Sequence, residues 1–431
     1  MHQSRPRHAP ETSWIYTCIS LLMTTSACSA FPASSNTSGS PASVAQISQP
    51  NFGNAVTSGS QQTLASDNFD LADGPVPILS PDSLHAPTDQ SPSEFPLPGP
   101  INIIPNVELR GSIDVRYRNA DSGRKHGAYL NAAELDFNRE FRENRQYKGS
   151  LVLQLISEQP PDVAQSSGVQ LGQVYAQYRL PIQTDTSSTV YFRAGQFQLP
   201  FGLLATYDPH RLIQQPLYAQ SLGVRTDWGI GVSGRFYGYL NYDFAITTGN
   251  GPDHVQFSPR RVFTFRLGRT FVTRNGLVNV GGSMLSGRLP DTSLDAENLF
   301  AVELPASGRV TLGRGVGPID KTRIAVDGTY IFKGTTARGE AISGADHDHR
   351  VFGYYGEAEY RFSRRAATIT SYSFWKYPIG NSTASRAAAG ISYAPQQNTT
   401  LRVLYEYLRD VPTNIHGTVR HRFTVQALFR F

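Results

Sequence analysis

Cysteine is nearly absent from this sequence of 431 residues. Only Cys18 and Cys28 are present, and both lie near the N-terminus, so no disulfide can cross-link the rest of the chain. Long apolar runs are absent too. No stretch reaches the roughly 20 apolar residues that a membrane-spanning helix needs, which excludes a helical membrane protein. A membrane β-barrel is not excluded, because its strands alternate apolar and polar residues and their average hydropathy is unremarkable.

Net charge and catalytic motifs are also sparse. The net charge of +5 is small and spread along the chain, so nucleic acid is not an expected partner. The sequence holds no G-x-S-x-G, H-E-x-x-H or P-loop motif. Asp208, His210 and Ser221 share one predicted loop without a group to orient a base, and Asp346–His349 is typical of a solvated loop tip. We therefore expect no enzyme activity, no cofactor and no metal site.

Residues 1–30 predict an export signal. A basic start is followed by a short apolar core, Trp14–Met23, and then by small residues up to a cleavage site after Ala30. The alternative is a lipoprotein signal that ends at Cys28, although Thr25 stands where Leu is usual. Both readings take the chain out of the cytoplasm.

Residues 31–104 are rich in Ser, Pro, Gln, Ala, Thr and Gly and show little periodicity. Such a segment cannot bury enough apolar area to offset the entropy lost on ordering. We expect a disordered periplasmic leader rather than a small folded module, because prolines crowd its C-terminal part.

An alternation of apolar and polar residues starts at Val107 and recurs as far as Phe431, although some strands, such as Leu151–Ile156, are apolar on both faces. The last strand shows it most clearly, with one face formed by Phe423, Val425, Ala427, Phe429 and Phe431 and the other by Arg422, Thr424, Gln426, Leu428 and Arg430. Successive side chains of a strand point to opposite faces, so each strand has one apolar and one mainly polar face. The sequence predicts an all-β fold over residues 105–431: a transmembrane antiparallel β-barrel of about sixteen strands with lipid outside and water inside. A secreted soluble β-sandwich is the alternative.

The connections between these strands alternate between short and long, as periplasmic turns and extracellular loops do. Phe197–Arg225 is one of the two longest, and it is the third on the long side. Gly344–His349 is expected to be another connection on that side, although it is no longer than some turns.

One segment at the start of the third long connection has a recognisable pattern. In Gly195–Gly202 the two glycines allow sharp backbone turns and Pro200 cannot donate to a ladder, so the strand stops there. The segment resembles the strand-to-loop segment of the phosphate-selective porin O and P family. Two weaker stretches, Ile324–Tyr330 and Val351–Arg361, are similar to other strands of that family, and the resemblance covers roughly Val107–Phe431.

The resemblance implies a porin of the bacterial outer membrane, usually a homotrimer, that lets small hydrophilic solutes diffuse passively. It also implies that the third loop folds into the lumen and that arginines and lysines along the pore give it a preference for anions. Its expected partners are outer-membrane lipid and small hydrophilic or anionic solutes. The alternative function is a plugged outer-membrane barrel that acts as a hydrolase or an adhesin, or a secreted soluble β-protein.

Candidate residues for the constriction and for contact with anions lie in the third loop and on the polar strand faces. They are His210, Arg211, Arg225, Arg193, Arg266, Arg323 and Arg402, with Arg110 and Arg116 as further wall residues. The third loop contains no lysine, and six carboxylates are expected to share the lumen: Glu134, Asp243, Asp327, Glu357, Glu359 and Glu406. Because many arginines can pair with these carboxylates, we expect a weak anion preference at most.

Overall fold

A computed structural model describes residues 101–104, 107–120, 127–143, 146–158, 168–181, 188–206, 217–252, 261–273, 276–291, 318–377, 383–409 and 420–431. All of them belong to one unit, Val76–Phe431. The predicted export signal, Cys28 and the predicted leader as far as residue 100 lie outside the described residues. Within the described part, no helix has the length and apolar composition needed to cross a membrane.

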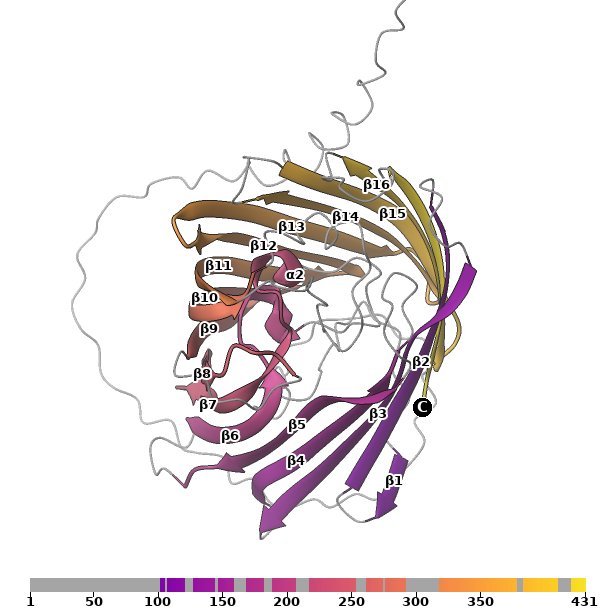
Figure 1. Cartoon of the computed structure of the whole chain (residues 1–431). Coiled ribbons are helices and arrows are strands. Elements are labelled where there is room, and N and C mark those ends of the chain that lie inside the picture. The colour runs from indigo at the N-terminus through magenta and orange to yellow at the C-terminus, as the bar shows by residue number, and fades with distance from the viewer. Residues whose placement is uncertain are drawn as a thin grey trace, which may run out of the picture. The chain divides into compact units, whose positions relative to one another are not determined.

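Sixteen antiparallel strands, β2 to β17, form the fold, which confirms the predicted architecture (Figure 1). Each strand pairs with the next, and β17 pairs with β2, so the sheet closes on itself without an edge. The strands are β2 (Val107–Ala120), β3 (Gly127–Glu143), β4 (Gln146–Ser157), β5 (Val169–Arg179), β6 (Thr189–Gln198), β7 (Thr226–Phe236), β8 (Leu240–Thr247), β9 (Val262–Thr273), β10 (Gly276–Pro290), β11 (Pro318–Phe332), β12 (Thr335–Asp346), β13 (His349–Arg361), β14 (Ala366–Lys376), β15 (Thr383–Gln396), β16 (Thr399–Arg409) and β17 (His421–Arg430).

The seam between β17 and β2 is completed by the last residue. The backbone N–H of Phe431 donates to the carbonyl of Gly111 at 2.9 Å, and the N–H of Gly111 donates to the carbonyl of Phe431 at 2.9 Å. A Cβ atom at Gly111 would lie 2.2 Å from Cζ of Phe431, so the terminal ring occupies the space of the missing side chain. A short strand, β1 (Ile101–Ile104), pairs with β2 beyond this point, so the sheet begins four residues inside the predicted leader.

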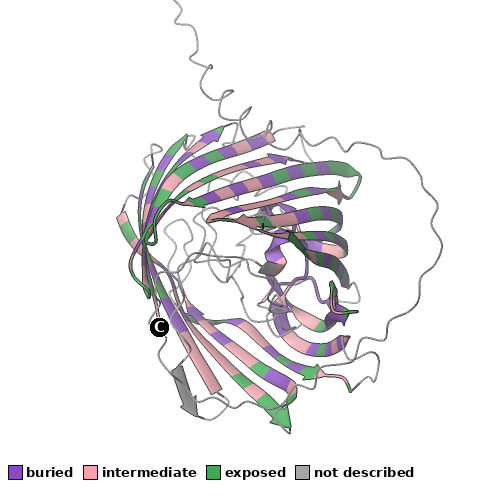
Figure 2. Cartoon of the chain, turned by 180° about the vertical axis from the view of Figure 1, so that it is seen from behind, coloured by how far each residue is buried: buried purple, intermediate pink, exposed green. Residues whose placement is uncertain are grey.

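The apolar faces of the strands point out of the barrel, as the alternation predicts. Phe429 is 45% exposed on β17, whereas its neighbours Gln426 and Leu428 are fully buried, and Val326 on β11 is 58% exposed. Figure 2 shows the same alternation of exposed and buried residues along most strands. In a soluble sandwich the apolar side chains would be the buried ones. The predicted alternative of a soluble β-sandwich is therefore wrong.

The connection predicted at Gly344–His349 is shorter than expected. Its residues pair across β12 and β13, with Gly344 opposite Val351 and Asp346 opposite His349. Only His347 and Asp348 remain as the turn, and His347 takes a positive φ of 49°. The prediction relied on the glycine and the charged residues, which are typical of loops, but the ladder hydrogen bonds of both neighbouring strands override that local preference.

Candidate functional site

The described parts of the connection between β6 and β7 lie inside the barrel. They include a short 3-10 helix, η2 (Gly202–Thr206), and a single helical turn, α2 (Tyr218–Ser221). Figure 1 shows α2 within the ring of strands. Gly195 and Gly202 have φ values of 133° and 54°, and β6 ends at Gln198, before Pro200. The strand end before Pro200 and the turn at Gly202 are thus present as predicted, whereas Gly195 lies inside β6 and pairs with Tyr175 and Gly229. We call the described residues 199–206 and 217–225 the inner loop.

Apolar packing holds the inner loop against the wall. The buried cluster contains Leu199, Phe201, Leu203, Leu204, Leu217, Leu222 and Val224 of the loop, together with Val262, Leu285, Leu289, Ala325, Ile342, Val351, Tyr355, Trp375, Tyr377, Ala384 and Leu408 from β9 to β16 and the residue after β14. Sequence reasoning missed this inner patch. The signal was present, since apolar residues such as Leu285, Ile342 and Trp375 stand at positions where the alternation expects polar ones.

Polar contacts fix the inner loop at separate points. Glu340 on β12 accepts hydrogen bonds from the backbone N–H groups of Leu203 at 3.0 Å and Leu217 at 2.9 Å. The N–H of Gly202 donates to Ser283 Oγ on β10 at 3.0 Å. The carbonyl of Ser221, at the end of α2, accepts a bond from Arg323 Nη2 at 3.0 Å.

Three of the predicted arginines are bound to carboxylates on neighbouring or nearby strands. Arg193 Nη2 donates to Asp243 Oδ1 at 2.7 Å, and its guanidinium also lies 4.1 Å from the ring centre of Phe197. Arg266 Nη2 lies 2.5 Å from Asp327 Oδ1. Arg323 binds Asp346 and also donates to the carbonyls of residues 322 and 345.

The other predicted residues do not join these arginines in one site. Arg225 is buried where the inner loop meets β7, and its carbonyl accepts the N–H of Leu199 at 3.0 Å. His210 and Arg211 lie outside the described residues. Arg193, Arg266, Arg323 and Arg402 stand on β6, β9, β11 and β16, so they are distributed around the wall.

A concentrated group of arginines lies on the adjacent strands β15, β16, β17 and β2. We call it the arginine sector, and its members are Arg386, Arg402, Arg422, Arg116 and Arg118, all buried inside the barrel. Register brings them together, because Arg402 is opposite Gln426 and Gln426 is opposite Arg116. Sequence reasoning named two of the five, although the other three occupy the same polar face of their strands.

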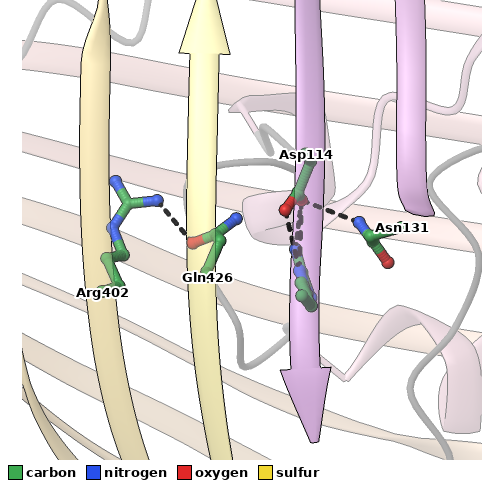
Figure 3. A network of polar contacts seen from close by, with 5 residues as sticks. Asp114, Asn131, Arg402 and Gln426 are labelled. Carbon is green, nitrogen blue, oxygen red and sulfur yellow. Dashed lines mark hydrogen bonds and ion pairs between the residues drawn. The ribbon is translucent and has the colours of Figure 1, made fainter. Parts of the chain in front are cut away.

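Two buried carboxylates, Asp114 and Glu406, accompany the five arginines of the arginine sector. Arg116 Nη2 donates to Asp114 Oδ2 at 2.7 Å, and Asn131 Nδ2 donates to the same oxygen at 2.8 Å. Arg422 Nη2 donates to Glu406 Oε1 at 2.7 Å. Arg402 Nη1 donates to the uncharged Gln426 at 3.0 Å (Figure 3). Positive charge is therefore in excess among the described residues of this sector.

The described interior as a whole is close to neutral. Its buried charged side chains comprise eleven basic and ten acidic residues. Oppositely charged groups at contact distance cancel most of each other's field a few ångströms away. The excess of positive charge on β15, β16, β17 and β2 is thus local.

Neither the comparison with models of protein families nor the comparison with curated proteins finds a match. Solved structures do match. OmpF of Salmonella typhi in complex with daunomycin is 13% identical with a TM-score of 0.55, over 75% of this chain and 97% of that one. The anion-selective porin of Comamonas acidovorans is 13% identical (TM-score 0.51; 75% and 98% covered), and the trimer form of OmpT, an outer-membrane protein of Vibrio cholerae, is 10% identical (TM-score 0.51; 75% and 99% covered).

At these identities the likeness shows the fold. The fold is a closed sixteen-stranded barrel with an apolar exterior and a polar, charged interior. An exterior of this kind is stable against hydrocarbon and not against water. The chain is therefore a barrel of the bacterial outer membrane, as the alternation and the C-terminal strand predict.

Proposed function

We propose that the protein is a porin: a passive channel through which small hydrophilic solutes diffuse, without covalent chemistry and without a cofactor. The observation that carries this proposal is the position of the inner loop. Its described residues pack along the wall from β9 to β16 and form hydrogen bonds with β10, β11 and β12. A loop held on one wall narrows a barrel, whereas a plug crosses it.

The arginine sector supports a weak preference of this channel for anions. Five guanidiniums accompany two carboxylates there, so a passing anion meets an attractive local field. The near balance of buried charge elsewhere supports a preference that is weak. Selectivity for phosphate, which the resemblance in Gly195–Gly202 implies, stays a prediction.

Recording in planar bilayers tests the channel directly. A porin gives stepwise currents, and a salt gradient across the bilayer gives a reversal potential whose sign reports which ion passes more easily. We expect stepwise increases in current and a small reversal potential whose sign indicates a preference for anions. Repeated insertion without current would contradict the proposal and favour a plugged barrel that acts as a hydrolase or an adhesin.

We also propose a homotrimer. The trimer form of OmpT of Vibrio cholerae, which shares this fold, supports the assembly. Light scattering of the purified protein in detergent, corrected for bound detergent, should give three times the mass of the mature chain. A mass of one chain would contradict this proposal and leave the channel untouched.

A further inference from the structure

One carboxylate holds two separate points of the inner loop. Glu340 is 6% exposed, and its two oxygens accept different backbone donors. Oε2 accepts the N–H of Leu203 at 3.0 Å, and Oε1 accepts the N–H of Leu217 at 2.9 Å. Leu203 belongs to η2 and Leu217 directly precedes α2, so Glu340 binds two described parts of the inner loop at once.

The backbone next to Leu203 leaves room for the carboxylate of Glu340. Gly202 has a φ of 54°, and a Cβ atom there would lie 2.6 Å from Glu340 Oε2. Only glycine leaves room for the carboxylate and accepts that conformation without strain. Because the N–H of Gly202 binds Ser283 Oγ at 3.0 Å, two successive N–H groups face the wall.

Two further hydrogen bonds hold the loop beside Leu203, from the N–H of Gly202 to Ser283 and from Gln198 to the carbonyl of Leu204, but among the described contacts these do not join that point to Leu217 as Glu340 does. Apolar packing is not directional, so the apolar cluster keeps the loop on the wall without setting its position along the strands. The carbonyl of Ser221 is held by Arg323, which pairs with Gly344 on β12, four residues beyond Glu340. At about 3.3 Å per residue this second anchor lies roughly 13 Å further along the strand.

We infer that Glu340 is the positioning residue of the inner loop. Its two carboxylate oxygens set where η2 and the residues around α2 stand on the wall, and through them the cross-section of the pore and the largest solute that passes. The inference deepens the proposed function and rests on it for the pore measurements alone.

The test compares Glu340→Gln with Glu357→Gln. A carboxamide accepts one of the two backbone N–H groups but turns an NH2 group toward the other, so one donor loses its partner. Glu357 is a matched control, since it is a buried carboxylate on the next strand and binds Tyr355 and Arg338 of the wall. In Glu340→Gln we expect hydrogen exchange of residues 202–206 and 217–221 to accelerate by roughly tenfold or more. We also expect a second conductance level and entry of larger neutral solutes in liposome swelling.

The comparison of the two variants can contradict the role proposed for Glu340. Equal exchange, conductance and exclusion limit in Glu340→Gln and Glu357→Gln would overturn it. If Glu340→Gln does not fold, Glu340→Asp replaces it, because the shorter carboxylate keeps its charge but cannot reach both donors, and unchanged exchange there would overturn the inference. Faster exchange in a protein that never conducts would refute the channel and leave the positioning role standing.

Discussion

Replacing Asp227 by asparagine should release the start of the connection between β8 and β9. Asp227, at the beginning of β7, is completely buried, and its oxygens accept four hydrogen bonds. The donors are the N–H groups of Trp228 at 2.9 Å, Gly249 at 2.5 Å and Gly251 at 3.1 Å, and Thr248 Oγ1 at 2.8 Å. Gly249 and Gly251 take φ values of 77° and 76°, which turn their N–H groups toward the carboxylate.

The geometry sets the size of the effect. Of the four described bonds, only the one from Gly249 goes to Oδ2, so the least costly asparagine rotamer keeps the three bonds to Oδ1 and loses this one. A hydrogen bond to a charged group contributes about 1.5–3 kcal/mol, and each 1.4 kcal/mol is a factor of about ten in an opening equilibrium. Amide exchange of residues 248–252 should therefore accelerate by roughly 10- to 100-fold in Asp227→Asn.

The assay is hydrogen exchange of the full protein in detergent, read peptide by peptide. Exchange in β13 to β17 should stay unchanged, because these strands share no hydrogen bond with Asp227. Asp320→Asn, near the start of β11, is a control for loss of a carboxylate. The reasoning is refuted if residues 248–252 exchange at the same rate in Asp227→Asn and in the unsubstituted protein.

Three further substitutions test the other parts of the structure. Arg402→Gln should shift the reversal potential under a salt gradient toward cations, while Arg142→Gln, in an exposed ion pair on β3, should not. Trp375→Ala should destabilise the inner loop by about 3–5 kcal/mol, measured as faster exchange of residues 199–206, because it removes a large buried side chain from the apolar cluster. Gly111→Ala should lower the temperature at which the barrel unfolds on a semi-native gel, by pushing away the ring of Phe431; Gly356→Ala is the matched control, since its Cβ would meet nothing within 4 Å.

The barrel could be predicted from the sequence because its signal is local. The alternation from Val107 to Phe431 depends only on the period of two in a strand and on which face meets lipid. Pro200 likewise acts through its own backbone, so the end of β6 at Gln198 followed from residue type. The loop predicted at Gly344–His349 was wrong because residue type alone favoured a loop there. Pairing with the two neighbouring strands extends β12 and β13 through most of it instead.

The site could be predicted only in part, because its chemistry depends on register. Alternation places Arg193 inside the barrel but cannot say that Asp243, fifty residues away, will bind it. Arg323 shows the consequence most clearly. As a lone lumen arginine it suggested a contact with solute, yet it donates to Asp346 and to the carbonyl of Ser221 in the inner loop. A charge on the polar face can thus serve the pore either by meeting the solute or by holding the loop that narrows its path, and only the paired strands distinguish these roles.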